Sequence, residues 1–114
     1  MKKAKLYICP SCSNVLFSTG ETELSCCGRR MTALVAKPQD ESHTISVEEI
    51  ENDYYVTLNH EMSKSHYISF VACVNYDRIL LLKLYPEQNA EVRFPQMRGR
   101  LYVCCNQHGL WERK

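Results

Sequence analysis

The four cysteines nearest the N-terminus constrain the fold of this chain more than any other feature of its sequence. They form a Cys9-x-x-Cys12 knuckle followed by an adjacent pair, Cys26-Cys27. Both sulfurs of such a knuckle reach one ion, but adjacent strand residues point to opposite faces, so the chain must turn at the second pair. Gly28 permits that turn. We therefore expect all four thiolates to bind one metal, either iron or zinc, with a purely structural zinc knuckle as the alternative.

The segment around these cysteines is too short to fold on a hydrophobic core alone. Chains below about 40 residues usually need a metal or disulfides, and metal binding is coupled to folding in such units. The polar, proline-containing segment 37–42 interrupts the apolar pattern and marks a boundary. We expect a metal domain over residues 1–37 and a second domain over residues 38–114. In the first domain, apolar runs predict small strands joined by turns, over residues 6–8, 14–17 and 31–36.

The rest of the chain has the pattern of an all-β domain. Short segments rich in Tyr, Val, Ile and Phe alternate with turn signals such as Asn75-Tyr76-Asp77. Strands at this spacing predict an antiparallel sandwich or barrel, and no helix is expected. The expected strands cover residues 43–49, 54–58, 66–74, 78–85, 90–94 and 99–105.

Composition and charge exclude several classes of function. The 114 residues carry a net charge of +1, so the chain has no strong field for general attraction to nucleic acid or a membrane. No apolar run approaches the length of a membrane span, and the basic start lacks the apolar core of a secretory signal. Seven cysteines is an odd number, and without an export signal reduced, metal-bound cysteines fit better than disulfides. We expect a cytoplasmic protein.

A second set of metal-binding residue types lies in the C-terminal part. Isolated histidines are often surface or hydrogen-bonded core residues, and a lone cysteine is often a buried apolar residue. Here they lie beside expected strands or in adjoining loops, and loops at one end of a sandwich can converge. Four imidazoles and one thiolate leave one position of an octahedral ion open to a small anion, and zinc normally prefers four ligands, which favours iron. The expected ligands are His43, His60, His66, Cys105 and His108.

These motifs, in this order, resemble those of the desulfoferrodoxin family of superoxide reductases over nearly the whole chain. The cysteine knuckle, with Cys26-Cys27-Gly28 and Met31, resembles the family's desulforedoxin-type N-terminal domain. The paired histidines and the C-terminal motif carry most of the specificity. The motifs that resemble the catalytic iron site are Glu41-Ser42-His43, His60-x5-His66 and Cys105-Asn106-x-His108-Gly109-x-Trp111.

The resemblance implies a rubredoxin- or desulforedoxin-like knuckle followed by an immunoglobulin-like β-sandwich that holds a square-pyramidal iron. Its equatorial ligands would be His43, His60, His66 and His108, and its axial ligand Cys105. Family members reduce superoxide to hydrogen peroxide at the open sixth position and are re-reduced by a carrier such as rubredoxin. The resemblance also implies a homodimer, iron at the five-ligand site, and iron or zinc at the four-cysteine site.

Two further residues bear on catalysis. Glu41 matches the family's glutamate before the first histidine, which implies a role at the sixth position of ferric iron; a solvated linker carboxylate is the alternative. The family's lysine that follows this glutamate, which helps to draw in superoxide, is replaced by Ser42. Lys64, in the loop between His60 and His66, is a candidate substitute, with an ordinary exposed lysine as its alternative.

Two other functions compete with superoxide reduction. A non-catalytic iron-binding redox sensor or electron-transfer module would keep the metal ligands without the reaction, and the missing lysine favours it. A zinc-ribbon interaction domain would explain the N-terminal cysteines but none of the histidines, and the chain has no basic patch for nucleic acid. Superoxide consumption by the reduced protein, compared with a Cys105→Ser variant, separates an enzyme from a module.

Overall fold

The computed structural model describes residues 5–9, 12, 14–20, 22–38, 44–75 and 78–113. The chain divides into two units, residues 1–35 and 36–114. All regular secondary structure in the described residues is β-strand, as the sequence predicts. No helix in this part of the chain is long and apolar enough to cross a membrane.

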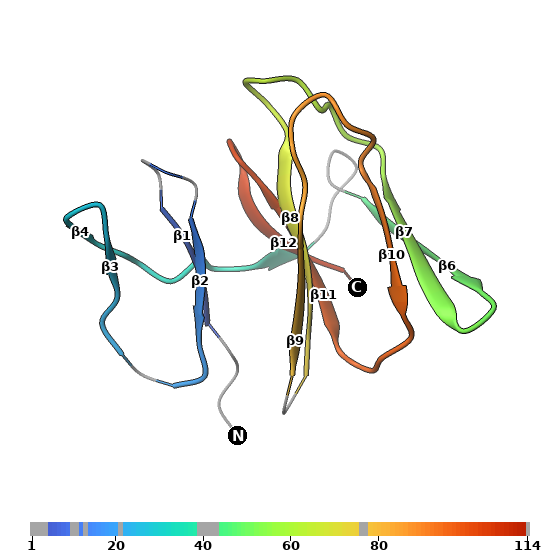
Figure 1. Cartoon of the computed structure of the whole chain (residues 1–114), viewed down its shortest axis with the longest axis horizontal. Helices are drawn as coiled ribbons and strands as arrows, with labels where there is room; N and C mark the ends of the chain where they lie inside the picture. Colours follow the sequence, from blue (N-terminus) through green and yellow to red (C-terminus); the bar gives the residue numbers. More distant parts are fainter. Residues whose placement is uncertain are drawn as a thin grey trace. The chain divides into compact units, whose positions relative to one another are not determined.

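The first unit contains two short antiparallel pairs of strands (Figure 1). The pairs are β1 (Lys5–Ile8) with β2 (Val15–Ser18), and β3 (Ser25–Cys26) with β4 (Arg29–Arg30). In the described part of this unit only Leu6, Tyr7 and Cys9 are buried. So little buried apolar surface does not stabilise a fold by itself, which leaves a role for the cysteines.

The apolar run 31–36 forms no strand, contrary to the sequence-based prediction. Its backbone instead makes single bonds to other segments of the first unit. Met31 N donates to Leu24 O at 2.8 Å, and Leu34 N donates to Leu6 O at 2.8 Å. The apolar run therefore indicates an extended segment here. It does not indicate whether a neighbouring strand will pair with that segment and complete a β-ladder.

The second unit is a β-sandwich of two sheets (Figure 1). Its strands are β5 (Lys37–Pro38), β6 (Ile45–Ile50), β7 (Asp53–Leu58), β8 (Ile68–Val74), β9 (Ile79–Lys83), β10 (Glu91–Pro95), β11 (Arg100–Cys105) and β12 (Gly109–Glu112). The smaller sheet has the order β10-β7-β6, and the larger sheet has the order β5-β12-β11-β8-β9. All neighbouring strands are antiparallel except β5 and β12, which run parallel.

The core of the second unit lies between the two sheets. Leu101, Val103 and Cys105 alternate along β11 and face this core, as the period of two along a strand requires. Val56 of β7 and Phe94 of β10 belong to the same buried cluster from the other sheet. Full burial of one such aliphatic or aromatic side chain contributes about 1.5–3 kcal/mol. Cys105 is therefore a core residue as well as a candidate ligand.

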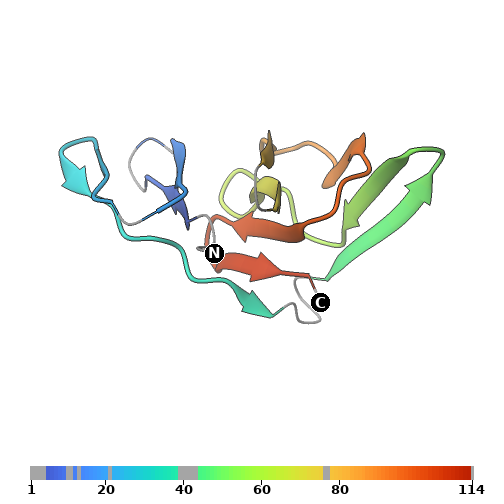
Figure 2. The same cartoon turned by 90° about the horizontal axis from the view of Figure 1, so that it is seen from below.

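The six strands predicted in this unit are all present, with ends shifted by at most two residues. The sequence predicts neither β5 nor β12, because Lys37 and Pro38 belong to the polar segment that is expected to mark a domain boundary. These two residues instead lie opposite Trp111 and Glu112, and Figure 2 shows β5 in teal beside β12 in red. Proline is tolerated on an edge strand, and β5 is at the edge of its sheet. A lysine and a proline do not predict a strand by themselves. These two residues form β5 because β12 lies beside them.

Candidate metal centres

A tight turn lets the adjacent cysteines of the first unit share one site. Cys27 and Gly28 form the two-residue turn between β3 and β4, with φ values of 54° and 74°. Positive φ at both central residues is typical of the type I′ hairpin turn. The sulfur of Cys27 lies 3.9 Å from that of Cys26, which is 3.5 Å from the sulfur of Cys12. The turn predicted at this pair is therefore confirmed.

The four thiols, called here the four-cysteine cluster, fit a single metal ion. The sulfurs of Cys9, Cys12, Cys26 and Cys27 all lie within 4.8 Å of one another. The neighbouring Cys12 thiol raises the pKa of Cys27 to about 12 and raises the pKa of Cys26. Sulfurs so close together cannot all lose their protons unless a cation compensates their charge. Four thiolates suit iron or zinc.

Asn14 holds the knuckle against the second cysteine pair. Its carbonyl oxygen accepts a hydrogen bond from Cys9 N at 2.9 Å, and its Nδ2 donates to Cys26 Sγ at 3.9 Å. All seven cysteines are free thiols, so no disulfide competes for these sulfurs.

A tight hairpin brings Cys105 and His108 of the second unit together. Cys105 pairs with Gly109 across β11 and β12, which leaves a three-residue loop between them. Gly109 has a φ of 88°, a left-handed conformation that glycine adopts without strain and that three-residue hairpin loops commonly require. The sulfur of Cys105 lies 3.4 Å from His108 Nδ1. The Cys-x-x-His spacing thus corresponds to one hairpin.

A shift in strand register separates Cys105 from its neighbour Cys104. Cys104 lies opposite Phe70 of β8, but Cys105 lies opposite Ile68, so the register slips by one residue between them. Such bulges often re-aim a side chain beside a functional site. Cys105 belongs to the core cluster between the sheets, whereas Cys104 is buried outside it. Burial raises the pKa of Cys104 to about 12, which makes it a poor source of thiolate.

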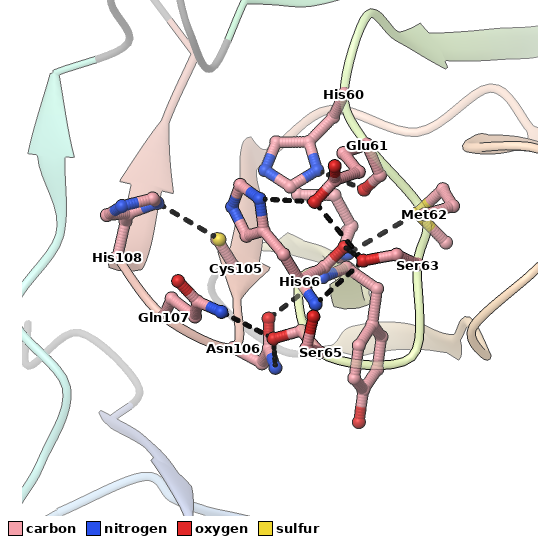
Figure 3. Close-up of polar contacts among 12 residues, drawn as sticks. His60, Glu61, Met62, Ser63, Ser65, His66, Cys105, Asn106, Gln107 and His108 are labelled. Atoms are coloured by element: carbon pink, nitrogen blue, oxygen red, sulfur yellow. Dashed lines mark hydrogen bonds and ion pairs between the residues drawn. The ribbon is translucent and has the colours of Figure 1, made fainter.

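Hydrogen bonds join the hairpin loop to the loop that precedes β8 (Figure 3). Asn106 Oδ1 accepts from Tyr67 N at 2.8 Å, and Asn106 Nδ2 donates to Ser65 O at 3.0 Å. Gln107 Nε2 donates to the same Ser65 carbonyl at 2.5 Å. These bonds fix the position of His66, the residue between Ser65 and Tyr67, relative to Cys105.

The described histidines converge on Cys105 and form with it the histidine–cysteine cluster, consisting of His60, His66, His108 and Cys105 (Figure 3). Ligand atoms of His60, His66 and Cys105 all lie within 4.8 Å of one another. The ring centroids of His60 and His66 are 4.5 Å apart, and those of His66 and His108 are 5.0 Å apart. The Nε2 atom of His66 is buried and has no hydrogen-bond partner in the described part of the chain. A buried, unpartnered nitrogen beside a thiol is costly unless a metal ion occupies the space.

Three further site residues are predicted for this part of the chain. Glu41 and His43 lie outside the described residues. Lys64 is in the loop between His60 and His66, where it is exposed and forms no hydrogen bond or ion pair with another described residue.

Two charged residues next to the cluster are missing from the sequence-based prediction. Lys37 Nζ donates to His108 O at 2.9 Å and lies 4.9 Å from the centre of the Trp111 ring. Its position depends on the parallel pairing of β5 with β12, which no local pattern signals. Glu61 accepts a hydrogen bond from His66 Nδ1 at 3.0 Å. The sequence shows that Glu61 is next to His60. It does not show that the Glu61 side chain points toward His66.

Comparisons with known proteins agree with this architecture. No protein-family model matches the chain. A desulfoferrodoxin homolog of Methanothermobacter thermautotrophicus is 31% identical over 120 residues, which span 94% of this chain and 95% of the relative. Desulfoferrodoxin of Clostridium acetobutylicum is 29% identical over 105 residues, which span 86% of this chain and 84% of the relative.

Solved structures show the same fold. The superoxide reductase of Treponema pallidum matches with a TM-score of 0.85 and 21% identity, over 100% of both chains. The superoxide reductase of Giardia intestinalis matches with a TM-score of 0.52 and 18% identity, over 64% of this chain and 95% of that one. Fold and clusters together define an all-β metalloprotein with separate thiolate and imidazole–thiolate sites. From its likeness to the Methanothermobacter protein, the chain belongs to the desulfoferrodoxin family.

Proposed function

We propose that the chain is a superoxide reductase, which converts superoxide to hydrogen peroxide with one electron and two protons. The observation that carries this proposal is the convergence of imidazoles on Cys105 around the buried, unpartnered Nε2 of His66. Four imidazoles and one thiolate would leave a sixth position open for a small anion. The superoxide reductase names of the Treponema and Giardia proteins support the same activity. The proposed iron ligands are His43, His60, His66, His108 and Cys105.

Ferrous iron in this cluster would supply the electron that superoxide receives. The chain itself contributes an electron-rich thiolate from a core position, since Cys105 is only 1% exposed and water is excluded from it. Neutral imidazoles supply nitrogen lone pairs from the two loops that hydrogen bonds hold together. Glu41 is proposed to reach the sixth position of the oxidised iron. Exposed Lys64 is proposed to add positive charge along the approach of superoxide.

The four-cysteine cluster is proposed to bind a second iron, or zinc, in a domain of its own. This centre passes electrons or only stabilises its domain, and the reaction does not depend on it. The proposed electron donor is a rubredoxin-like carrier, and the proposed assembly is a homodimer in the cytoplasm.

The decisive experiment is the product stoichiometry when pre-reduced, iron-loaded protein meets superoxide. We expect one hydrogen peroxide per superoxide and no oxygen, and we expect Cys105→Ser to react only at the background rate. Oxygen release would indicate dismutation and a different catalytic cycle. No consumption above background would favour the second candidate, an iron-binding redox sensor or electron-transfer module. The feature that favours this second candidate is Ser42, which stands where the family has its lysine.

A further inference from the structure

The carboxylate of Glu61 determines which nitrogen of His66 carries the proton. Glu61 Oε2 lies 3.0 Å from His66 Nδ1 and also accepts a hydrogen bond from Ser63 Oγ at 3.1 Å (Figure 3). An ionised carboxylate only accepts hydrogen bonds, so Nδ1 must be the donor. In a neutral imidazole the other nitrogen then has a free lone pair. That other nitrogen is Nε2, which is buried without a hydrogen-bond partner among the described residues.

The backbone of the same residue orients His60. The carbonyl oxygen of Glu61 lies 2.6 Å from His60 Nδ1. A carbonyl oxygen also accepts only, so Nδ1 of His60 carries a proton and its buried Nε2 has the lone pair. One residue therefore assigns the same tautomer to two neighbouring imidazoles, through its side chain in one case and its main chain in the other.

The loop that carries these three residues is itself closed by hydrogen bonds. Ser63 N donates to His66 O at 3.0 Å, and His66 N donates to Ser63 Oγ at 3.1 Å. These bonds form a turn that sets the distance between Ser63 and His66. Because Ser63 also donates to the Glu61 carboxylate, the turn holds that carboxylate beside the ring.

We propose that Glu61 is a positioning residue for the histidine–cysteine site. It fixes the His66 tautomer, and its negative charge makes the ring a stronger donor to the metal. A stronger donor stabilises ferric iron relative to ferrous iron, so the carboxylate lowers the reduction potential of the site. The inference rests on the proposed metal site but not on the proposed reaction.

Two substitutions separate the charge of Glu61 from its hydrogen bond. Glu61→Gln keeps an oxygen that accepts from Nδ1 but removes the charge, whereas Glu61→Ala removes both. Loss of such a partner typically weakens metal binding about 10- to 100-fold. We expect a loss in this range for Glu61→Ala and a smaller one for Glu61→Gln, with a raised reduction potential in both. The matched control is Glu49→Gln, which removes the charge of an exposed carboxylate on β6. Glu49 lies opposite Tyr54 in the strand register, at the end of β7 that is remote from His60.

Three measurements test the proposal. Chelator competition with cobalt as the probe gives metal affinity, and a redox titration of the iron-loaded protein gives the potential. Nitrogen NMR of the metal-free protein gives the His66 tautomer, which should stay Nδ1-protonated in Glu61→Gln and become mixed in Glu61→Ala. Unchanged affinity, potential and tautomer in both variants would overturn the proposal. If Glu61→Ala unfolds, Glu61→Gln alone still decides through the potential.

The outcome is independent of the proposed function. If the variants shift affinity and potential but the wild-type protein consumes no superoxide, the role of Glu61 stands and the enzymatic proposal fails. If the wild-type protein reduces superoxide and both variants match it in every measurement, the enzymatic proposal stands and the role of Glu61 fails.

Discussion

Lys37 keeps a positive charge beside the histidine–cysteine cluster although the family's lysine is absent at Ser42. Its ammonium group is held by the His108 carbonyl and the face of the Trp111 ring. A cation over an indole ring is attracted by about 0.5–1 kcal/mol at an exposed site. The charge is therefore localised near one proposed ligand, whereas the exposed Lys64 has no such contacts among the described residues.

Removal of this charge should slow the encounter with superoxide. Steering by charge changes association rates by about tenfold or more, so we expect Lys37→Gln to lower the second-order rate constant by up to about tenfold at low salt. The difference should shrink at higher salt, because screening shortens the Debye length to about 8 Å at 0.15 M. Pulse radiolysis or stopped-flow at several ionic strengths measures it.

Two companion variants complete this comparison. Arg98→Gln removes an equal charge next to the end of β11 remote from Cys105, and we expect no change in rate. Lys64→Gln tests the proposed contribution of Lys64 in the same assay. Equal rates for Lys37→Gln and the wild type at every salt concentration would show that Lys37 takes no part in attraction.

Cys104 should make stability fall at alkaline pH. Burial raises the pKa of its thiol in the folded protein to about 12, from an ordinary value of 9.0. As the pH rises, the unfolded chain loses this proton first, so unfolding becomes easier between about pH 9 and about pH 12. Below pH 9 the contribution of the protonated Cys104 thiol to the free energy of unfolding is fully retained. Urea unfolding of the wild type and Cys104→Ala across this range should show a shallower fall in the variant; parallel curves would contradict the prediction.

At the scale of elements, the β11–β12 hairpin sets the geometry of Cys105 and His108, and Gly109 makes it possible. Among the described residues, a β-carbon added at Gly109 would meet only Lys37 Nζ, at 3.9 Å, so steric clash with them is not the constraint. The positive φ is. A left-handed conformation costs a residue with a β-carbon about 1–2 kcal/mol.

Gly109→Ala should therefore lower the free energy of unfolding by about 1–2 kcal/mol and weaken metal binding at the histidine–cysteine cluster. Asparagine adopts positive φ more readily, so Gly109→Asn should lose less of both. Denaturant unfolding and cobalt titration of the two variants measure the difference. Equal losses in Ala and Asn would point to the added side chain rather than to the backbone conformation.

The predictability of each element follows from what its residues encode locally. Strands such as β8, whose residues Ile68–Cys73 are all buried, were predictable because apolar and β-branched residues dominate them. The hairpin that joins Cys105 to His108 was not predicted, because the sequence analysis assigned no strand after Cys105 and used the Cys-x-x-His spacing only as a ligand pattern. β5 was not predictable, because two polar or proline residues become a strand only when β12 lies beside them. Glu61 was missed for a similar reason, since its role depends on a side-chain direction.

At the scale of the whole molecule, the two clusters lie in different units of the chain. The four cysteines fall within residues 1–35, and the described histidines and Cys105 fall within residues 36–114. Replacing Cys9 with Ser should therefore abolish metal binding at the four-cysteine cluster and leave superoxide reduction mostly intact. Metal analysis with the superoxide assay checks this. Loss of both would mean that the histidine–cysteine site depends on the first unit.

The family and the all-β fold were predictable because several separate motifs occur in one order along most of the chain. The convergence of His60, His66, His108 and Cys105 was predictable only as an expectation about loops at one end of a sandwich. The hydrogen bonds that produce it involve Ser65, Asn106 and Gln107. Asn106 belongs to the C-terminal motif, but no local pattern predicts which groups these three residues bond.

Those bonds between the two ligand-bearing loops also affect how the protein matures. They are made entirely by the chain, so the second unit can assemble its binding site before an ion arrives. The first unit, with three buried residues in its described part, gains its stability together with its metal. A shortage of metal should thus leave the second unit of a newly made molecule folded and ready to be loaded, and the first unit exposed to proteolysis.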